Sequence, residues 1–211
     1  GHTRYTTKGS HKDLSEAQPL KSNDNTVSLV HNGQIECEAD TSDSLALLKS
    51  IHQLGLTTTN IESKFRHLFS KLKGSYSCVT LVQNVGLIAF RDPRGIRPLV
   101  MNCVGDSNTV LFASESCAWQ KSENDIVLDV LPGQVCWVRL DGSIEFIRPI
   151  PEVPLVPELC LFELIYLAHD DSVMDGVSIR EARKQFGKNL APRIQRFPHS
   201  IDVIVPVPHT P

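Results

Sequence analysis

The sequence has no long hydrophobic run and no strong excess of charge of one sign. No apolar stretch approaches the roughly 18 residues that a membrane-spanning helix needs. The first ten residues are polar, which is unlike a signal peptide. A net charge of -3 over 211 residues gives no sign of nucleic-acid or acidic-membrane binding. We therefore expect a cytoplasmic protein that binds neither nucleic acid nor membrane.

The sequence also lacks paired cysteines. Its six cysteines are widely and irregularly spaced, and none forms a Cys-x-x-Cys pair. This spacing indicates neither a zinc site nor a small disulfide scaffold. Several cysteines lie in apolar strand-like runs, as Cys78 does, and are expected to be reduced and buried. Because Met is absent from position 1 and the chain stops soon after a strand-like run, we expect a piece of a longer protein.

What is present is the composition of a folded domain, with 41% hydrophobic and 21% charged residues. Apolar residues at helical spacing predict helices over residues 45–54, after the N-cap candidates Ser42 to Ser44, and over about 61–72. Later segments alternate with period two and are separated by Gly, Pro, Asn and Asp, which predicts antiparallel strands. The expected strands cover residues 26–30, 75–83, 86–90, 109–113, 134–138 and 143–147. Helices followed by strands favour an α+β fold.

Four prolines between residues 149 and 157 are typical of a domain boundary. We expect one domain over residues 1–150 and the beginning of a second over 151–211. In the second part, residues 178–194 read as a helix with a capping box of Ser178 and Glu181. Residues 201–207 are predicted to form a buried strand of the parallel type.

Asn32-Gly33 follows the apolar run that ends at Val30. An Asn-Gly pair between two alternating runs is a strong local signal for a tight hairpin, because both residues tolerate positive φ. An alternative is that the Asn32 side-chain amide and the Gly33 N–H hold a developing oxyanion. The two roles are compatible.

Three further polar positions allow both a structural and a functional interpretation. Arg4 could capture a carboxylate through its planar fork, or could be a surface arginine. Asp43 could bind an ammonium group, or could be a helix N-cap. Residues 91–99 contain three arginines and one aspartate, which suits a phosphate site or, as we prefer, an internally paired turn.

Motifs along nearly the whole chain resemble one family. In order they are Gly1-His2-Thr3-Arg4-Tyr5, Ser15-Glu16-Ala17-Gln18-Pro19, His31-Asn32-Gly33, Ser42-Asp43-Ser44, the turn at 91–99, Ala113-Ser114-Glu115-Ser116, Leu131-Pro132-Gly133, Cys160 to Tyr166, and Asp171-Ser172. The ordered set resembles the glutamine phosphoribosylpyrophosphate amidotransferases, or amidophosphoribosyltransferases. The hexosamine-forming amidotransferases share fewer of these motifs and are the alternative family.

The resemblance implies an N-terminal-nucleophile glutaminase domain, a four-layer αββα sandwich, followed by the start of a type I phosphoribosyltransferase domain. It implies that Asn32 and Gly33 form the oxyanion hole. It further implies that Arg4, Thr7, His31 and Asp43 bind glutamine. The implied substrates are glutamine and phosphoribosylpyrophosphate, the implied reaction is the first step of purine synthesis, and the whole enzyme is expected to be a homo-oligomer.

Two parts of that machinery are not in the sequence given. The family nucleophile is an N-terminal cysteine thiol activated by its own α-amine, and the phosphate-binding loop follows the transferase strand. We therefore expect this chain alone to be inactive, and a non-catalytic glutamine-binding protein is a further alternative. The resemblance also implies Mg²⁺ in the full enzyme. Cys160 is either a ligand of a 4Fe-4S cluster or a structural thiol.

Overall fold

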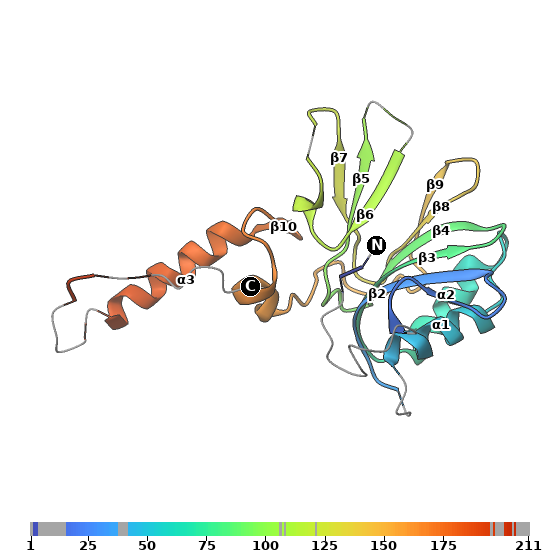
Figure 1. The fold of residues 1–211 in the computed structure, drawn as a ribbon, viewed down its shortest axis with the longest axis horizontal. Helices are drawn as coiled ribbons and strands as arrows, with labels where there is room; N and C mark the ends of the chain where they lie inside the picture. The colour runs from blue at the N-terminus through green and yellow to red at the C-terminus, as the bar shows by residue number, and fades with distance from the viewer. Residues whose placement is uncertain are drawn as a thin grey trace.

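The computed structural model describes residues 2–3, 16–37, 42–105, 107, 109–120, 122–194, 196, 201–203 and 205. The described chain combines antiparallel sheets with two helices on the body and a third on an extension (Figure 1). This mixture agrees with the α+β class expected from the sequence.

The larger sheet has six strands in the order β1-β2-β3-β4-β8-β9. These strands are β1 (Leu20–Lys21), β2 (Val27–Ile35), β3 (Gly74–Val82), β4 (Gly86–Arg91), β8 (Val135–Val138) and β9 (Ile144–Ile147). Every neighbouring pair is antiparallel, and β2 and β3 pair from Val27–Val82 to Ile35–Gly74. β1 covers only a short part of β2, so the rest of that edge is not paired with a strand among the described residues.

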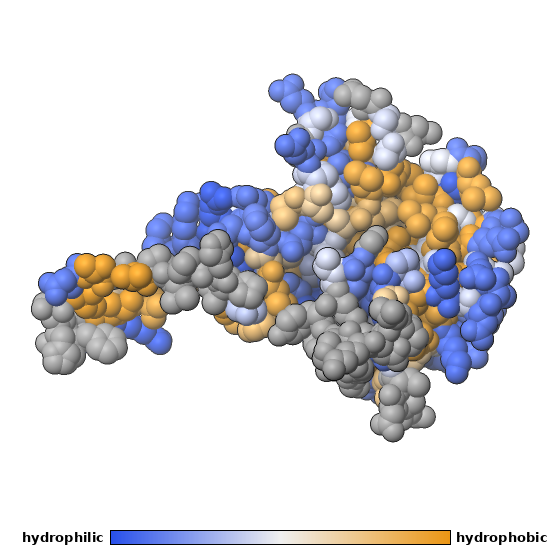
Figure 2. Space-filling view, viewed as in Figure 1, coloured by the Kyte–Doolittle hydropathy of each residue, from blue (hydrophilic) through white to orange (hydrophobic). Residues whose placement is uncertain are grey.

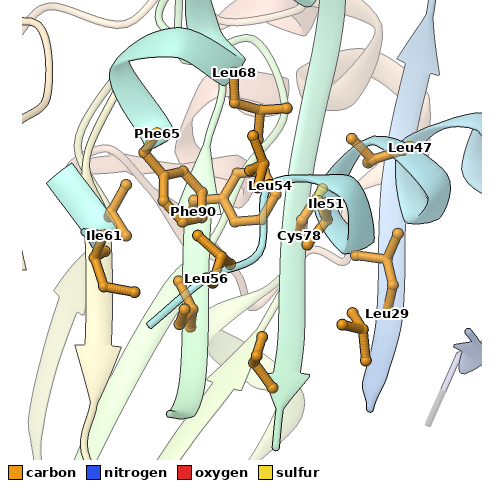
Figure 3. Close-up of a cluster of buried hydrophobic side chains, with 14 of the residues drawn as sticks. Leu29, Leu47, Ile51, Leu54, Leu56, Ile61, Phe65, Leu68, Cys78 and Phe90 are labelled. Carbon is orange, nitrogen blue, oxygen red and sulfur yellow. The ribbon is translucent and has the colours of Figure 1, made fainter. Parts of the chain in front are cut away.

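Helices α1 (Asp43–Gln53) and α2 (Ile61–Lys71) cover one face of this sheet (Figure 1). The predicted apolar stripes are buried there, because Leu47, Ile51 and Phe65 are at most 1% exposed. Figure 3 shows Phe65 of α2 beside Phe90 of β4, with ring centroids 5.0 Å apart. This apolar layer is the main core.

A smaller sheet of β6 (Thr109–Ala113), β5 (Val100–Val104) and β7 (Ile126–Asp129), in the order β6-β5-β7, lies on the other side of the larger sheet. Ala89 and Cys136 of the larger sheet pack with Leu99 and Val130, which flank β5 and β7. The described residues thus form helix, sheet and sheet layers. Strands β5 and β7 were not predicted, since the polar Asn102 interrupts the apolar run of the central strand.

The hairpin predicted at Asn32-Gly33 is wrong. β2 continues straight through both residues, with Asn32 opposite Ser77 and Gly33 opposite Tyr76. Gly33 has φ +148, and a Cβ built there would lie 2.0 Å from the Ser75 carbonyl oxygen. Glycine is needed for the close approach of β3, and the long pairing with β3 overrides the local turn preference.

The turn at residues 91–99 is internally paired, as preferred from the sequence. The Arg91 side chain is fully buried and donates to the carbonyl oxygens of Gly95, Arg97 and Val130. It also forms two hydrogen bonds to the Asp175 carboxylate, at 2.7 and 2.8 Å. The turn therefore connects the body to the segment that follows the proline run.

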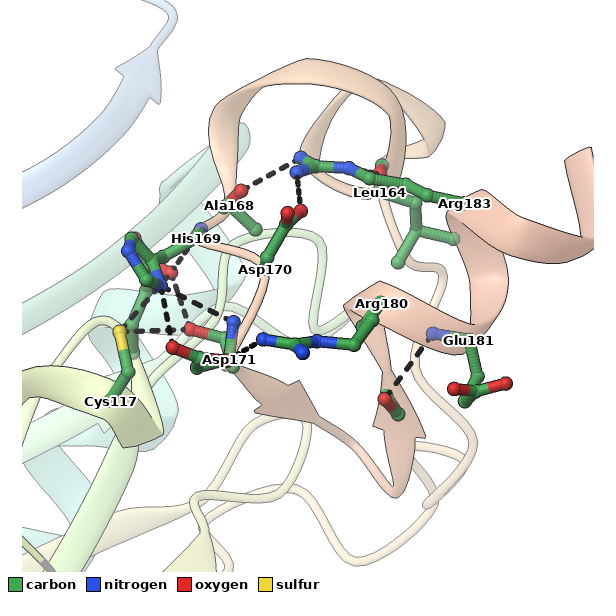
Figure 4. Close-up of polar contacts among 12 residues, drawn as sticks. Cys117, Leu164, Ala168, His169, Asp170, Asp171, Arg180, Glu181 and Arg183 are labelled. Atoms are coloured by element: carbon green, nitrogen blue, oxygen red, sulfur yellow. Dashed lines mark hydrogen bonds and ion pairs between the residues drawn. The ribbon is translucent and has the colours of Figure 1, made fainter. Parts of the chain in front are cut away.

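That segment contains a π-helix η3 (Glu163–Leu167), a short hairpin of β10 (Val173–Met174) and β11 (Val177–Ser178), and helix α3 (Ile179–Ile194). Ser178 accepts the Glu181 N–H at 3.4 Å, which is half of the predicted capping box. Figure 4 shows Arg183 of α3 donating to the Leu164 and Ala168 carbonyl oxygens, at 2.9 and 2.7 Å. These bonds hold α3 against η3.

Helix α3 extends away from the body (Figure 1). Ile179 at its start is buried, whereas the apolar residues Phe186 and Leu190 further along the helix are 38% and 52% exposed. Figure 2 shows hydrophobic surface at the end of this extension that lies farthest from the body. None of the helices in the described part of the chain has the length and apolar character needed to span a bilayer.

The strand predicted over residues 201–207 is wrong for the residues that the structure describes. Residues 201–203 and 205 have no strand structure, and Ile201, Val203 and Val205 are exposed. A buried strand of a parallel sheet needs hydrogen-bonded neighbours, and no strand lies beside these residues within the described ranges.

Candidate functional site

A pocket of about 340 Å³ opens at the unpaired edge of β2, beside the first turn of α1. It brings together four residues that the sequence predicted: His31, Asn32, Gly33 and Asp43. The remaining lining residues are His2, Thr3, Gln18, Gln34, Ser42, Ser44, Arg97, Phe162 and Leu167. Arg4 and Thr7, the other predicted glutamine ligands, lie outside the described residues.

The Gly33 N–H points to the open edge of the sheet. Hydrogen bonds at both ends of the β2–β3 ladder, from Gln83 to Thr26 and from Glu36 to Lys73, show that even-numbered β2 residues bond to β3. In an antiparallel ladder, the N–H groups of the alternate residues face the other way. Among the described residues no acceptor is found for the Gly33 N–H, so it is available to a ligand in the pocket.

The Asn32 side chain lies on the face of β2 that is turned toward the smaller sheet, opposite the face on which His31 contacts α1. Its Nδ2 donates to the Ser114 hydroxyl, just after β6, at 3.3 Å. A primary amide has two N–H donors, and therefore one remains for a ligand. Two donors from adjacent residues are the arrangement that stabilises an oxyanion.

Asp43 stands at the first residue of α1, and Ser42 is the N-cap position. The Asp43 carboxylate accepts the N–H of Ser44 at 2.8 Å and the N–H of Ile35 at 3.1 Å. It therefore connects the start of α1 to the end of β2, in addition to lining the pocket. A carboxylate has about four lone-pair sites, so capacity remains to accept a ligand ammonium group.

His31 is buried against α1, and its Nδ1 lies 2.9 Å from the Ser44 hydroxyl. Burial lowers the pKa of His31 to about 4; the negative charge of Asp43 opposes this shift, whereas His2 and Arg97 favour it. The ring is therefore neutral at pH 7. Its Nε2 has no hydrogen-bond partner among the described residues. His31 also lines the pocket.

The other lining residues were not predicted as site residues, and four of them contribute side chains that matter for the geometry. Gln18 and Ser44 belong to quoted motifs but carried no predicted role, and both bond to His31. Arg97 was assigned to the structural turn, yet it lines the pocket and bonds to Glu163. Phe162 comes from beyond the proline run. No local pattern could have placed them here, because the pocket is lined by segments that lie far apart in the sequence.

No thiol lines the pocket within the described residues. Cys78 lines a separate cavity of about 90 Å³, which His2, His31 and Asn32 also line. Burial raises the pKa of the Cys78 thiol well above its ordinary value. A buried, protonated thiol is a poor nucleophile, which makes Cys78 unsuitable as the attacking group.

Cys160 is half-buried, and its thiol is free. In the part of the chain that the structure describes, no group of three or more His, Cys, Asp or Glu side chains could hold a metal ion. One thiol does not make a cluster site, so the described residues do not by themselves fit a 4Fe-4S cluster. Ligation by Cys160 stays a prediction.

Comparison with known proteins agrees with this geometry. Residues 2–121 match the family described as glutamine amidotransferase domain. The amidophosphoribosyltransferase of Pasteurella multocida is 33% identical over 100% of this chain and 47% of its own length, and that of Escherichia coli is 34% identical over 100% and 46%. The chain spans about half the length of the curated relatives it matches.

Solved structures show the same likeness. The glutamine phosphoribosylpyrophosphate amidotransferase of B. subtilis, complexed with ADP and GMP, has a TM-score of 0.76 and 28% identity, over 99% of this chain and 46% of that one. A second structure, of the allosteric regulatory enzyme of purine biosynthesis, gives 0.71 and 28%, over 92% and 43%. The expected glutaminase fold is thereby confirmed. Since the domain match covers more than half of the sequence, the chain belongs to the glutamine amidotransferase domain family.

Proposed function

We propose that this chain is the glutaminase part of an amidophosphoribosyltransferase. In this reaction glutamine is hydrolysed to glutamate and ammonia, and the ammonia displaces pyrophosphate from phosphoribosylpyrophosphate to give 5-phosphoribosylamine. The observation that carries the proposal is one pocket that holds the Asp43 carboxylate, the open Gly33 N–H and the Asn32 amide. Full-length relatives with the same domain support the substrates.

Each group has a distinct chemical task in this proposal. The Asp43 carboxylate accepts the α-ammonium group of glutamine, and Arg4 binds its α-carboxylate. Attack on the side-chain amide places negative charge on the carbonyl oxygen, which the Gly33 N–H and the second Asn32 N–H stabilise. The attacking thiol is expected from a cysteine that precedes Gly1 in the whole protein.

Loss of one oxyanion donor typically costs about 3–4 kcal/mol of transition-state stabilisation. Loss of the donor at Gly33 or at Asn32 should therefore lower the rate of glutamine hydrolysis by about 10²–10³-fold. We further propose that the whole enzyme is a homo-oligomer that uses Mg²⁺ with phosphoribosylpyrophosphate.

Calorimetric titration of the chain with glutamine tests the binding part of the proposal. Asp43→Asn should weaken binding about ten- to hundredfold, because a hydrogen bond to a charged group contributes roughly 1.5–3 kcal/mol. Asn keeps one acceptor oxygen, which can still accept the N–H of Ile35 or of Ser44, so the unfolding midpoint of the variant is measured alongside its affinity. Glu62→Gln, at an exposed position of α2, is the control and should bind as the wild type does. Equal affinity of all three proteins would contradict the proposal.

Ammonia release tests the catalytic part. The 211-residue chain should release none above background, whereas the full-length protein should form 5-phosphoribosylamine from glutamine and phosphoribosylpyrophosphate. Turnover by the chain alone would contradict the assignment of the nucleophile to a preceding cysteine. A full-length protein that binds glutamine and turns over neither substrate would instead support a non-catalytic binding protein.

A further inference from the structure

We propose that Gln18 is a positioning residue of this site. Its side-chain amide acts as one more residue of strand β1 and closes the edge of β2 beside the oxyanion position. As a result, within the residues that the structure describes, the Gly33 N–H is the one donor on this stretch of the edge without an acceptor. The inference deepens the proposed function and depends on it for the catalytic consequence.

The register of the short β1–β2 pairing carries the first step. Leu20 pairs with Leu29, and Gln18 lies two residues before Leu20 just as His31 lies two residues after Leu29. An extended β1 would therefore place residue 18 opposite His31. The structure puts the Gln18 side chain there in place of its backbone. Its Oε1 accepts the His31 N–H at 2.6 Å, and its Nε2 donates to the His31 carbonyl oxygen at 3.2 Å.

Two side chains thus close the edge on both sides of Gly33. The N–H groups that face away from β3 in this stretch belong to His31, Gly33 and Ile35. Gln18 accepts the first of them and Asp43 accepts the third, at 3.1 Å. Among the described residues only the Gly33 N–H has no acceptor. Successive donors on one strand edge are about 7 Å apart, so a ligand oxygen has one defined position.

Gln18 also connects this edge to α1. Its Nε2 lies 3.3 Å from the Ser44 hydroxyl, which in turn lies 2.9 Å from His31 Nδ1. The His31 peptide is therefore held from the sheet edge, and the His31 ring from the helix. Because oxyanion donors act only when they are held in the productive geometry, fixing the peptide two residues before Gly33 bears directly on catalysis.

Amide hydrogen exchange on the chain tests the geometry without reference to catalysis. In Gln18→Met, which keeps the length of the side chain, the His31 amide should exchange at least roughly tenfold faster. The Ile35 amide, which bonds to Asp43, should be unchanged. Gln18→Glu keeps the acceptor oxygen and should retain the protection of His31. The control Gln83→Met changes an exposed residue outside the pocket and should leave both amides unaffected.

Kinetics of the full-length protein test the consequence for catalysis. Gln18→Met should lower kcat for glutamine hydrolysis by up to about 10²-fold, the loss typical of a small misplacement, with KM within about twofold. Gln18→Glu should lie between Gln18→Met and the wild type. Unchanged exchange at His31, or an unchanged kcat, would overturn the inference, as would a rise in KM alone. If the wild type lacks glutaminase activity, the proposed function fails and the exchange comparison still decides the role of Gln18.

Discussion

Replacing Gly33 with alanine tests the straight course of β2, on which the whole site depends. Gly33 has φ +148, and the new Cβ would lie 2.0 Å from the Ser75 carbonyl oxygen and 2.8 Å from the Tyr76 Cα. Both atoms belong to the backbone of β3 and cannot move without separating the two strands. Gly55 offers a matched control, since it also has positive φ (+56) and no atom lies within 4 Å of an added Cβ.

Both substitutions place a side chain at positive φ, and they differ in the space available to the new Cβ. A side chain at positive φ costs roughly 1–2 kcal/mol, which is all that Gly55→Ala should lose. Forcing an atom into a closely packed site adds about 1–3 kcal/mol. We therefore expect Gly33→Ala to lower the free energy of unfolding by about 2–5 kcal/mol, which is about 1–3 kcal/mol more than Gly55→Ala.

Equilibrium unfolding in urea measures both values from the midpoint and slope of the transition. If the chain instead turned back at Asn32-Gly33 in a tight hairpin, β3 would not crowd Gly33, and only the conformational cost would remain. Values for the two variants that agree within about 0.5 kcal/mol, close to the limit of such comparisons, would refute the extended strand.

Two further predictions concern titration and the buried ion pair. The pKa of His31 is about 4 when folded and 6.5 when unfolded, so the unfolded chain binds the extra proton between these values and the free energy of unfolding falls as pH drops. The stability advantage of wild type over His31→Asn should shrink by up to about 3 kcal/mol from pH 7 to 4; a constant difference in urea midpoints would contradict this. Asp175→Asn leaves the buried Arg91 charge unpaired and should cost about 3–5 kcal/mol. Glu158→Gln removes the partner of the exposed Arg94 and should leave the unfolding midpoint nearly unchanged, because water screens the pair. Equal unfolding midpoints for Asp175→Asn and Glu158→Gln would argue against the burial effect.

Helices were the part of the fold best predicted from the sequence. The stripes over residues 45–54 and 61–72 agree with α1 and α2 to within two residues at each end, because burial against one sheet imposes helical spacing directly. The Asn32-Gly33 hairpin failed for the opposite reason. Turn preference is local, whereas β2 obtains its conformation from β3, which lies beyond both helices in the sequence.

Residues of the site could be predicted where a family motif contains them. Residues whose position depends only on strand pairing could not. His31, Asn32, Gly33 and Asp43 do meet in one pocket. The bridge from Gln18 depends on the register of a two-residue strand, which composition and periodicity do not reveal.

The pairing of β2 with β3 also determines how the site behaves during folding. The two strands are separated in sequence by both helices, so the edge that presents Gly33 forms only when the helices and the sheet assemble together. Pocket and core therefore belong to one cooperative unit. A ligand that occupies this pocket should stabilise the entire unit by RT ln(1 + [L]/Kd), about 2.7 kcal/mol at a hundredfold excess over Kd. The melting temperature of the domain thus becomes a direct measure of pocket occupancy.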